Sequence, residues 1–272
     1  LDLKFQRGDP AGEAEKVIAA VRHFIPGLSG RQALAMPRVE RSLKGFRRSR
    51  PSRSRHPLPF DVMAAIVGYF ILNHQWNLAV LIFLCFTMYL RPGEARKIRV
   101  EDVTRPIPGK RNPGLKHFGV IIGPQERPTE PTKTHQFDDT ILLDLPVYAG
   151  AVMKLLLSTL TTGLVFSLSG PEINLWWKKA VAALGLPPTT VMYQLRHGGA
   201  SDDALAKTRP LTEILNRGRW NSTASLKRYT KPGQVQKILN DLSPSMQMYC
   251  SRCAMKLEGM LLRREAPPPF PG

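Results

Sequence analysis

The feature that most constrains the fold is an apolar run of thirteen residues between Leu78 and Leu90, which only Thr87 interrupts. A helix that crosses a bilayer needs about 20 such residues, so the run predicts a buried core helix rather than a membrane span. Hydrophobic residues make up 43% of the 272 residues, which is enough for a sizeable core. No signal peptide opens the chain, and we expect no association with a membrane. Leu1 in place of an initiator Met indicates a fragment or a processed chain.

The net charge of the chain limits the kinds of binding partner that we expect. The chain has 39 Lys and Arg residues against 21 Asp and Glu, which gives a net charge of +18. Such a surplus is typical of proteins that meet nucleic acid, an anionic membrane or an acidic substrate. Three cysteines are too few for a disulfide framework and suggest a reducing compartment.

The pattern of apolar residues and chain breakers predicts a mainly α fold with a small antiparallel β-sheet (α+β). A helix at 14–24 comes before a basic segment at 47–55 that we interpret as a linker. Further helices are expected at 60–71, 77–90, 149–160, 171–184, 194–206, 211–217 and 222–230. Strands are expected at 100–104, 117–122 and 140–145, with a proline-containing loop or hairpin tip between the last two. The proline-rich end of the chain is expected to be disordered.

DNA strand transfer is catalysed either by carboxylates that hold two metal ions or by cations around the phosphate with a protein nucleophile. The notable acidic pairs, Asp138-Asp139 and Asp202-Asp203, are adjacent in sequence. Neighbouring side chains point to different faces of a helix or strand, so a two-metal site is disfavoured.

Four motifs favour the cationic route. They are Leu90-Arg91-Pro92-Gly93-Glu94-Ala95, Leu195-Arg196-His197-Gly198-Gly199-Ala200-Ser201, Gly218-Arg219-Trp220 and Ser225-Leu226-Lys227-Arg228-Tyr229. In order and spacing these motifs resemble the catalytic domain of tyrosine recombinases of the phage-integrase type. The last two look most like integrases of eukaryotic retroelements. The resemblance covers about residues 57–237.

The resemblance implies four regions. Residues 1–45 would be the remnant of a helical, DNA-clamping core-binding domain, and 46–56 a basic linker. Residues 57–242 would form the catalytic, integrase-like domain, and 243–272 a C-terminal tail.

The resemblance also implies roles for residues. Arg91 and Arg196 match the two arginines that clamp the phosphate, a task suited to a planar, permanently charged guanidinium. Glu94 would orient neighbouring cations. Lys133, between the second and third strands, would protonate the departing 5′ oxygen. Each of these residues could instead be an ordinary surface group, but the small residues around Arg196 permit a close backbone approach.

Tyr229 matches the nucleophile. A phenol has an ordinary pKa of about 10, so it needs positive charge nearby to react at neutral pH. Trp220 falls where the family has His or Trp, and its indole could donate to the phosphate or serve only the core. Tyr193 stands where the family usually has His. A phenol cannot exchange protons near neutral pH as imidazole does, so slower chemistry or an inactive descendant is possible. We interpret His197 as a core residue.

The implied function is a DNA recombinase or integrase that works through a 3′-phosphotyrosyl intermediate and is encoded by a mobile element. It would need no cofactor or metal, bind double-stranded DNA as a homotetramer, and use no small-molecule substrate. A helix near 234–242 could dock on a neighbouring subunit. The location would be intracellular: the nucleus in a eukaryote, otherwise the cytoplasm. The alternatives are an inactive DNA-binding descendant, a type IB topoisomerase and a basic RNA-binding protein. Cys250 and Cys253 form a lone pair that we interpret as incidental rather than zinc-binding.

Overall fold

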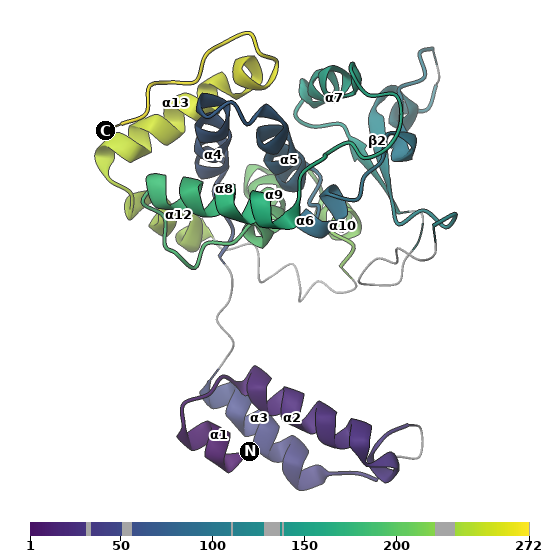
Figure 1. Cartoon of the computed structure of the whole chain (residues 1–272), viewed down its shortest axis with the longest axis vertical. Helices are drawn as coiled ribbons and strands as arrows, with labels where there is room; N and C mark the ends of the chain where they lie inside the picture. Colours follow the sequence, from purple (N-terminus) through teal and green to yellow (C-terminus); the bar gives the residue numbers. More distant parts are fainter. Residues whose placement is uncertain are drawn as a thin grey trace. The chain divides into compact units, whose positions relative to one another are not determined.

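The computed structural model describes residues 1–30, 34–50, 56–109, 111–127, 137, 139–220 and 232–271. The chain divides into two compact units, Leu1–Arg55 and His56–Gly272 (Figure 1). Most of the described elements are helices, and one small antiparallel sheet accompanies them. The expected fold class, mainly α with a small antiparallel sheet, is therefore confirmed.

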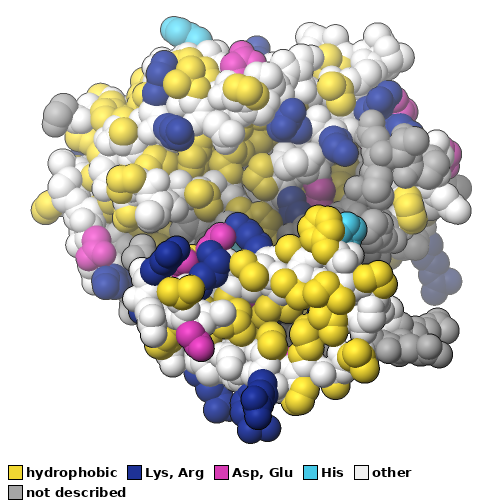
Figure 2. All heavy atoms as spheres, turned by 60° about the horizontal axis from the view of Figure 1, so that its bottom comes forward, with side chains coloured by type: hydrophobic (Ala, Val, Ile, Leu, Met, Phe, Trp, Pro, Cys, Tyr) yellow, Lys and Arg dark blue, Asp and Glu magenta, His cyan; other side chains and the backbone are white. Residues whose placement is uncertain are grey.

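The N-terminal unit is a small helical body. It consists of α1 (Asp2–Gln6), α2 (Ala11–Phe24), a 3-10 turn (Pro26–Leu28) and α3 (Pro37–Ser49). Helix α3 extends into the segment expected to be a linker, because apolar residues recur along it at helical spacing and bury Phe46. The core is small, and large hydrophobic side chains such as Val17, Val21 and Phe24 stay exposed. Figure 2 shows hydrophobic side chains gathered on the surface of this unit.

Two apolar helices form the centre of the C-terminal unit. They are α4 (Phe60–Leu72) and α5 (Trp76–Thr87), and every residue of α5 from Leu78 to Thr87 is buried. The predicted core helix is thus confirmed. Across the described residues, no helix combines the length and the apolar character that a bilayer crossing requires. Helix α5 packs against α4 and α9, and it also contacts α6 and α7 (Figure 1).

The remaining elements surround this pair. They are α6 (Pro92–Ala95), α7 (Ala149–Leu157), α8 (Gly170–Ala183), α9 (Tyr193–Ala206), α10 (Leu211–Arg217), α12 (Pro232–Asn240) and α13 (Pro244–Leu261), with 3-10 turns at Val100–Asp102 and Pro113–Lys116.

The sheet has the order β1-β2-β3 and is antiparallel throughout. Its strands are β1 (Val103–Thr104), β2 (Phe118–Ile122) and β3 (Asp139–Leu143). Val120 pairs with Val103 on one side and with Ile141 on the other, which buries one face of the sheet. The first strand is shorter than expected because Val100–Asp102 forms a 3-10 turn, in which Asp102 accepts hydrogen bonds from Arg99 and Arg127.

The end of the chain differs from the tail that we expected over 243–272. Helix α13 lies along α4, and its buried residues recur every three or four positions. Cys250 and Cys253 are free thiols within this interface, where Gly68 of α4 leaves room for the Cys253 sulfur. In the proline-rich end, the Phe270 ring packs 5.0 Å from the Tyr249 ring. This aromatic contact anchors a segment whose composition alone suggests disorder.

Candidate active site

The first part of the site is the turn after α5. Arg91 precedes α6, with Pro92 at its first position, and Glu94 accepts a hydrogen bond from the Arg91 backbone N–H at 2.8 Å. The two side chains also form an ion pair and are only 15% and 10% exposed. Burial alone would lower the pKa of Arg91, but Glu94 and a hydrogen bond with the Tyr193 phenol outweigh it and raise that pKa. Glu94 therefore fixes the Arg91 guanidinium.

Helix α9 brings Arg196 to the same place, and its side chain is fully buried. Its Nη1 donates to the Tyr89 carbonyl oxygen at 2.6 Å and lies 3.9 Å from Glu94 Oε2, and its Nη2 donates to the Gly218 carbonyl oxygen. Burial, followed by repulsion from two neighbouring arginines, lowers the pKa of Arg196 to about 10, so the group stays charged at neutral pH. The sequence motifs predicted that Arg91 and Arg196 share a site, and both lie at Glu94.

Glycines allow this approach. A Cβ at Gly198 would collide with the Leu58 carbonyl oxygen, and one at Gly199 would collide with the Phe86 carbonyl oxygen. The α9 backbone therefore rests directly on α5 and on the segment before α4. The expected close backbone approach beside Arg196 is confirmed.

Carbonyl groups compensate the buried charge of Arg196. Gly218 is the cap residue of α10, and the carbonyl groups at a helix C-terminus carry a negative partial charge. The Arg196 guanidinium thus lies between this helix C-terminus, the Tyr89 carbonyl oxygen and the Glu94 carboxylate. This arrangement explains how a cation can be buried completely.

Gly218-Arg219-Trp220 completes the described cluster. Arg219 Nη2 donates to Glu94 Oε2 at 2.5 Å, so three guanidinium groups lie around one carboxylate. The Trp220 ring stacks 6.2 Å from the Tyr89 ring and lies 5.1 Å from the Arg196 guanidinium. A Cβ at Gly218 would collide with the indole ring, so glycine is required there. The contact with Tyr89 fits the core role considered for Trp220, and its role as a phosphate donor stays a prediction.

Sequence reasoning gave no role to Arg219. Its motif was visible, but arginines are too numerous in this chain for sequence position alone to select one.

Tyr193 begins α9 and reaches Arg91. Its ring lies 4.8 Å from the His197 ring in an edge-to-face arrangement, and His197 is 4% exposed. The expected core position of His197 is confirmed. Tyr193 therefore contacts the cluster from the α9 side.

Two predicted residues, Lys133 and Tyr229, lie outside the described residues. Asp139, at the start of β3, acts electrostatically on Arg219, and Trp220 is the last described residue before the segment that contains Tyr229.

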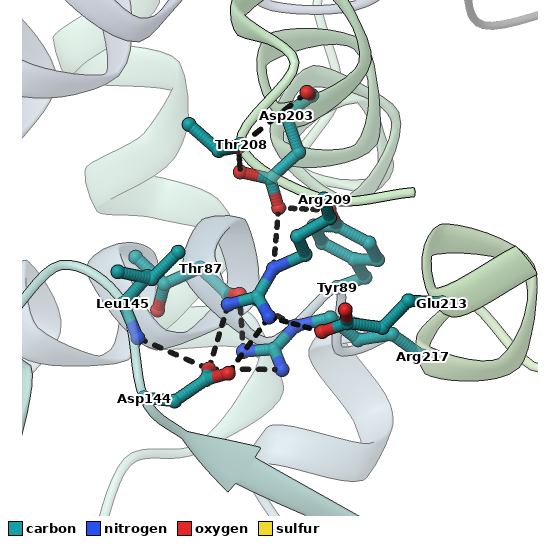
Figure 3. Close-up of polar contacts among 9 residues, drawn as sticks. All are labelled: Thr87, Tyr89, Asp144, Leu145, Asp203, Thr208, Arg209, Glu213 and Arg217. Atoms are coloured by element: carbon teal, nitrogen blue, oxygen red, sulfur yellow. Dashed lines mark hydrogen bonds and ion pairs between the residues drawn. The ribbon is translucent and has the colours of Figure 1, made fainter. Parts of the chain in front are cut away.

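A second ionic network joins the end of β3 to α10 and to the end of α5 (Figure 3). Asp144, just after β3, accepts hydrogen bonds from Arg209 at 2.7 and 2.6 Å and pairs with Arg217 at 3.3 Å. Arg217 also donates to the Thr87 carbonyl oxygen at 2.9 Å. Because Arg217 ends α10, these contacts hold the Gly218-Arg219-Trp220 segment beside the end of α5. Sequence reasoning missed this network, which joins residues 65 positions apart.

Comparisons with known proteins add little. No family model matches the chain, and no curated protein matches it. One similar solved structure is a XerH site-specific recombinase in a post-cleavage complex with its palindromic difH substrate, with 15% sequence identity and a TM-score of 0.47. The match covers 69% of this chain and about half, 52%, of that recombinase. At this level the similarity assigns neither a family nor a function.

Proposed function

We propose that this chain is a tyrosine recombinase, which cuts and rejoins DNA strands with Tyr229 as the nucleophile. One observation carries the proposal: Arg91 and Arg196 are 105 positions apart in sequence (196 − 91), yet both guanidinium groups lie at one carboxylate, Glu94. A buried group of cations that outnumber their acidic neighbours, Glu94 and Asp139, is suited to bind an anion. It is the arrangement that a phosphoryl-transfer transition state requires.

The proposed chemistry needs no energy source. The Tyr229 phenol gives its proton to solvent as its oxygen attacks the phosphorus, and the bond from phosphorus to the 5′ oxygen breaks as the new ester forms. The leaving oxygen takes a proton from Lys133 and becomes a 5′-hydroxyl. A second strand's 5′-hydroxyl then attacks the phosphotyrosyl ester and restores the phenol. Since one ester replaces another in each step, neither ATP nor a metal ion enters the balance.

Within this proposal the partner is double-stranded DNA. The exposed face of α3 carries Arg41, Lys44 and Arg48 at helical spacing, a pattern that suits contact with phosphates. We also propose a homotetramer on DNA, an origin in a mobile element and an intracellular location (nuclear in a eukaryote). The half-exposed helix α12 is the proposed contact between subunits. Sedimentation of the protein–DNA complex tests the assembly, and a single protomer per DNA site at every concentration would reject it.

The test uses a DNA duplex that carries a nick opposite the cleavage position, so that the cut strand diffuses away and the covalent adduct accumulates. The wild-type chain is expected to form the adduct, and Tyr229→Phe is expected to form none. Tyr69→Phe is the matched control, because Tyr69 lies on α4 against Phe270, away from the cluster. An adduct that survives Tyr229→Phe would refute the assignment. Relaxation of supercoiled plasmid without strand exchange would indicate a type IB topoisomerase instead.

A second candidate is a DNA-binding descendant without activity, and the contact between Tyr193 and Arg91 favours it. A phenol there can hold the arginine, but the site then lacks an imidazole that could transfer protons near neutral pH. In that case the wild-type chain binds DNA without forming an adduct. Equal affinity for RNA and DNA would instead indicate a general RNA-binding protein.

A further inference from the structure

Arg219 has an unusual backbone conformation. It follows the cap residue of α10 with φ of +50°, in the left-handed region. Glycine is the usual residue at this place after a helix, because a Cβ is strained there. Non-glycine residues in such conformations are concentrated at functional sites, where the side chain has a role that offsets the strain. The conformation of Arg219 therefore indicates a role for its side chain.

The side chain of Arg219 is 3% exposed, and only part of its hydrogen-bonding capacity is used. Its Nη2 donates to Glu94 Oε2, whereas its Nε and Nη1 have no hydrogen-bond partner among the residues that the structure describes. Burying such donors unsatisfied is costly, and more so when they carry charge. The Nε and Nη1 groups of Arg219 therefore remain available to donate hydrogen bonds to a further acceptor.

The surroundings indicate that the acceptor is an anion. Glu94 is shared, since Arg91 uses Oε1 while Arg219 and Arg196 both face Oε2. Glu94 and Asp139 are two carboxylates for three guanidinium groups, so one positive charge stays uncompensated. Arg91 repels both Arg219 and Arg196. A phosphate group has several oxygens and negative charge, so it can satisfy the remaining N–H groups and reduce the repulsion together.

We propose that Arg219 is a third phosphate-binding guanidinium of the site, with Nε and Nη1 directed to the oxygens of a DNA phosphodiester. This inference rests on the proposed function for the identity of the ligand. Because the two atoms are shielded from solvent in the chain alone, an anion reaches them when side chains at the rim move aside. The competing explanation is that Arg219 serves only as an ion-pair partner of Glu94.

Two variants separate these explanations. Arg219→Gly removes the guanidinium and suits the left-handed backbone, so it avoids the strain that alanine would keep. Arg219→Lys keeps a charge beside Glu94 but lacks the additional N–H groups. The matched control is Lys207→Gly, because Lys207 also follows a helix, has φ of +55° and is exposed. The control removes the same charge from the same kind of backbone position.

The first measurement is the rise of the melting temperature with inorganic phosphate, since a ligand that binds only the folded chain stabilises it. Wild type and Lys207→Gly are expected to gain equally, and Arg219→Gly is expected to lose most of the gain. The second measurement is the rate of adduct formation on the nicked DNA. Arg219→Gly is expected to slow it about 100-fold or more, as the loss of one transition-state donor does, and Arg219→Lys about 10-fold.

The outcomes distinguish the two proposals. If Arg219→Gly keeps both the phosphate-dependent stabilisation and the adduct rate, the inference is overturned while the recombinase proposal stands. If the wild type gains nothing from phosphate, the inference is also overturned. If phosphate stabilisation depends on Arg219 but no adduct forms with any DNA, the anion site is supported and the proposed function fails. Should Arg219→Gly not fold, an adduct rate for Arg219→Lys equal to that of wild type would overturn the inference.

Discussion

Replacing Asp144 by Asn tests how the structure holds α10 against α5. The Asp144 carboxylate faces two arginines whose side chains are only 3% and 6% exposed, Arg209 and Arg217. Asn has the same shape but no charge, and it offers one acceptor oxygen in place of two. The substitution therefore removes one hydrogen bond to a charged group, weakens another and leaves two buried cations with less compensation.

The expected loss follows from these contacts. A hydrogen bond to a charged group contributes about 1.5–3 kcal/mol, and breaking a buried ion pair costs about 3–5 kcal/mol. The lower end of the range for a buried ion pair applies, because Arg209 retains its ion pairs with Asp203 and Glu213. We expect the free energy of unfolding to fall by about 3 kcal/mol. For a unit of this size each kcal/mol lowers the melting temperature by about 2–4 °C, so the expected drop is about 6–12 °C.

Urea denaturation followed by circular dichroism measures the change, with thermal melting as a second readout. Asp241→Asn is the control, since Asp241 is an exposed acid just after α12 and the same substitution there should stay within about 0.5 kcal/mol. A loss below about 1 kcal/mol for Asp144→Asn would refute the idea that this carboxylate organises the end of α10.

Three further results are expected. Burial raises the pKa of Asp144, but the hydrogen bonds of Arg209 and the charges of Arg217 and Arg209 outweigh burial and lower that pKa in the folded chain. The stabilisation by Asp144 is therefore complete above about pH 4 and is lost as the pH falls through the folded pKa. Urea denaturation at several acidic pH values should show a weaker pH dependence for Asp144→Asn than for wild type. Asp202 is expected to act in the opposite direction, because burial and then the charge of Asp203 raise its pKa to about 6 in the folded chain. The fold therefore loses stability as the pH rises from about 4, the ordinary pKa, to about 6, and the loss is complete above that pH. Asp202→Asn should raise the free energy of unfolding at pH 7 by about 1–3 kcal/mol in the same assay, and a decrease would contradict this. Gly199→Ala should lower the free energy of unfolding by about 3 kcal/mol or more, because the new methyl group collides with backbone atoms that cannot rotate away. Gly233 has open space around it, so Gly233→Ala should change the free energy of unfolding by less than about 1 kcal/mol. Equal effects of the two substitutions would refute the close approach at Gly199.

A structural feature of this chain could be predicted when the residues that determine it lie close together in the sequence. The apolar run from Leu78 to Leu90 predicted its own helix, because burial on all sides needs no information from elsewhere in the chain. The shared location of Arg91 and Arg196 was predicted from motif order and resemblance, and the glycines after Arg196 predicted the close approach. Phe270 shows the limit of composition, since one aromatic side chain in a proline-rich segment found a partner that sequence could not indicate.

Two features could not be predicted for a different reason. The residues around Arg219 do not indicate a left-handed backbone conformation there. The usual signal for that conformation is a glycine at the position itself, whereas here the glycine is Gly218, one residue before Arg219. The pairing of Asp144 with Arg209 joins a strand end to the start of α10, and any of the 39 basic residues could have been the partner. Such pairings exist only once the helices are placed.

The complete burial of Arg196 has a thermodynamic consequence. The guanidinium loses its hydration water when the C-terminal unit folds, so the dehydration free energy of Arg196 is part of the free energy of folding. When an anion binds to the folded chain, the Arg196 guanidinium is already dehydrated and held by two carbonyl groups. Anion binding therefore includes no dehydration of the Arg196 side chain and little reorganisation of it. Conditions that loosen α9 should therefore weaken the cluster's hold on an anion well before the helices themselves melt.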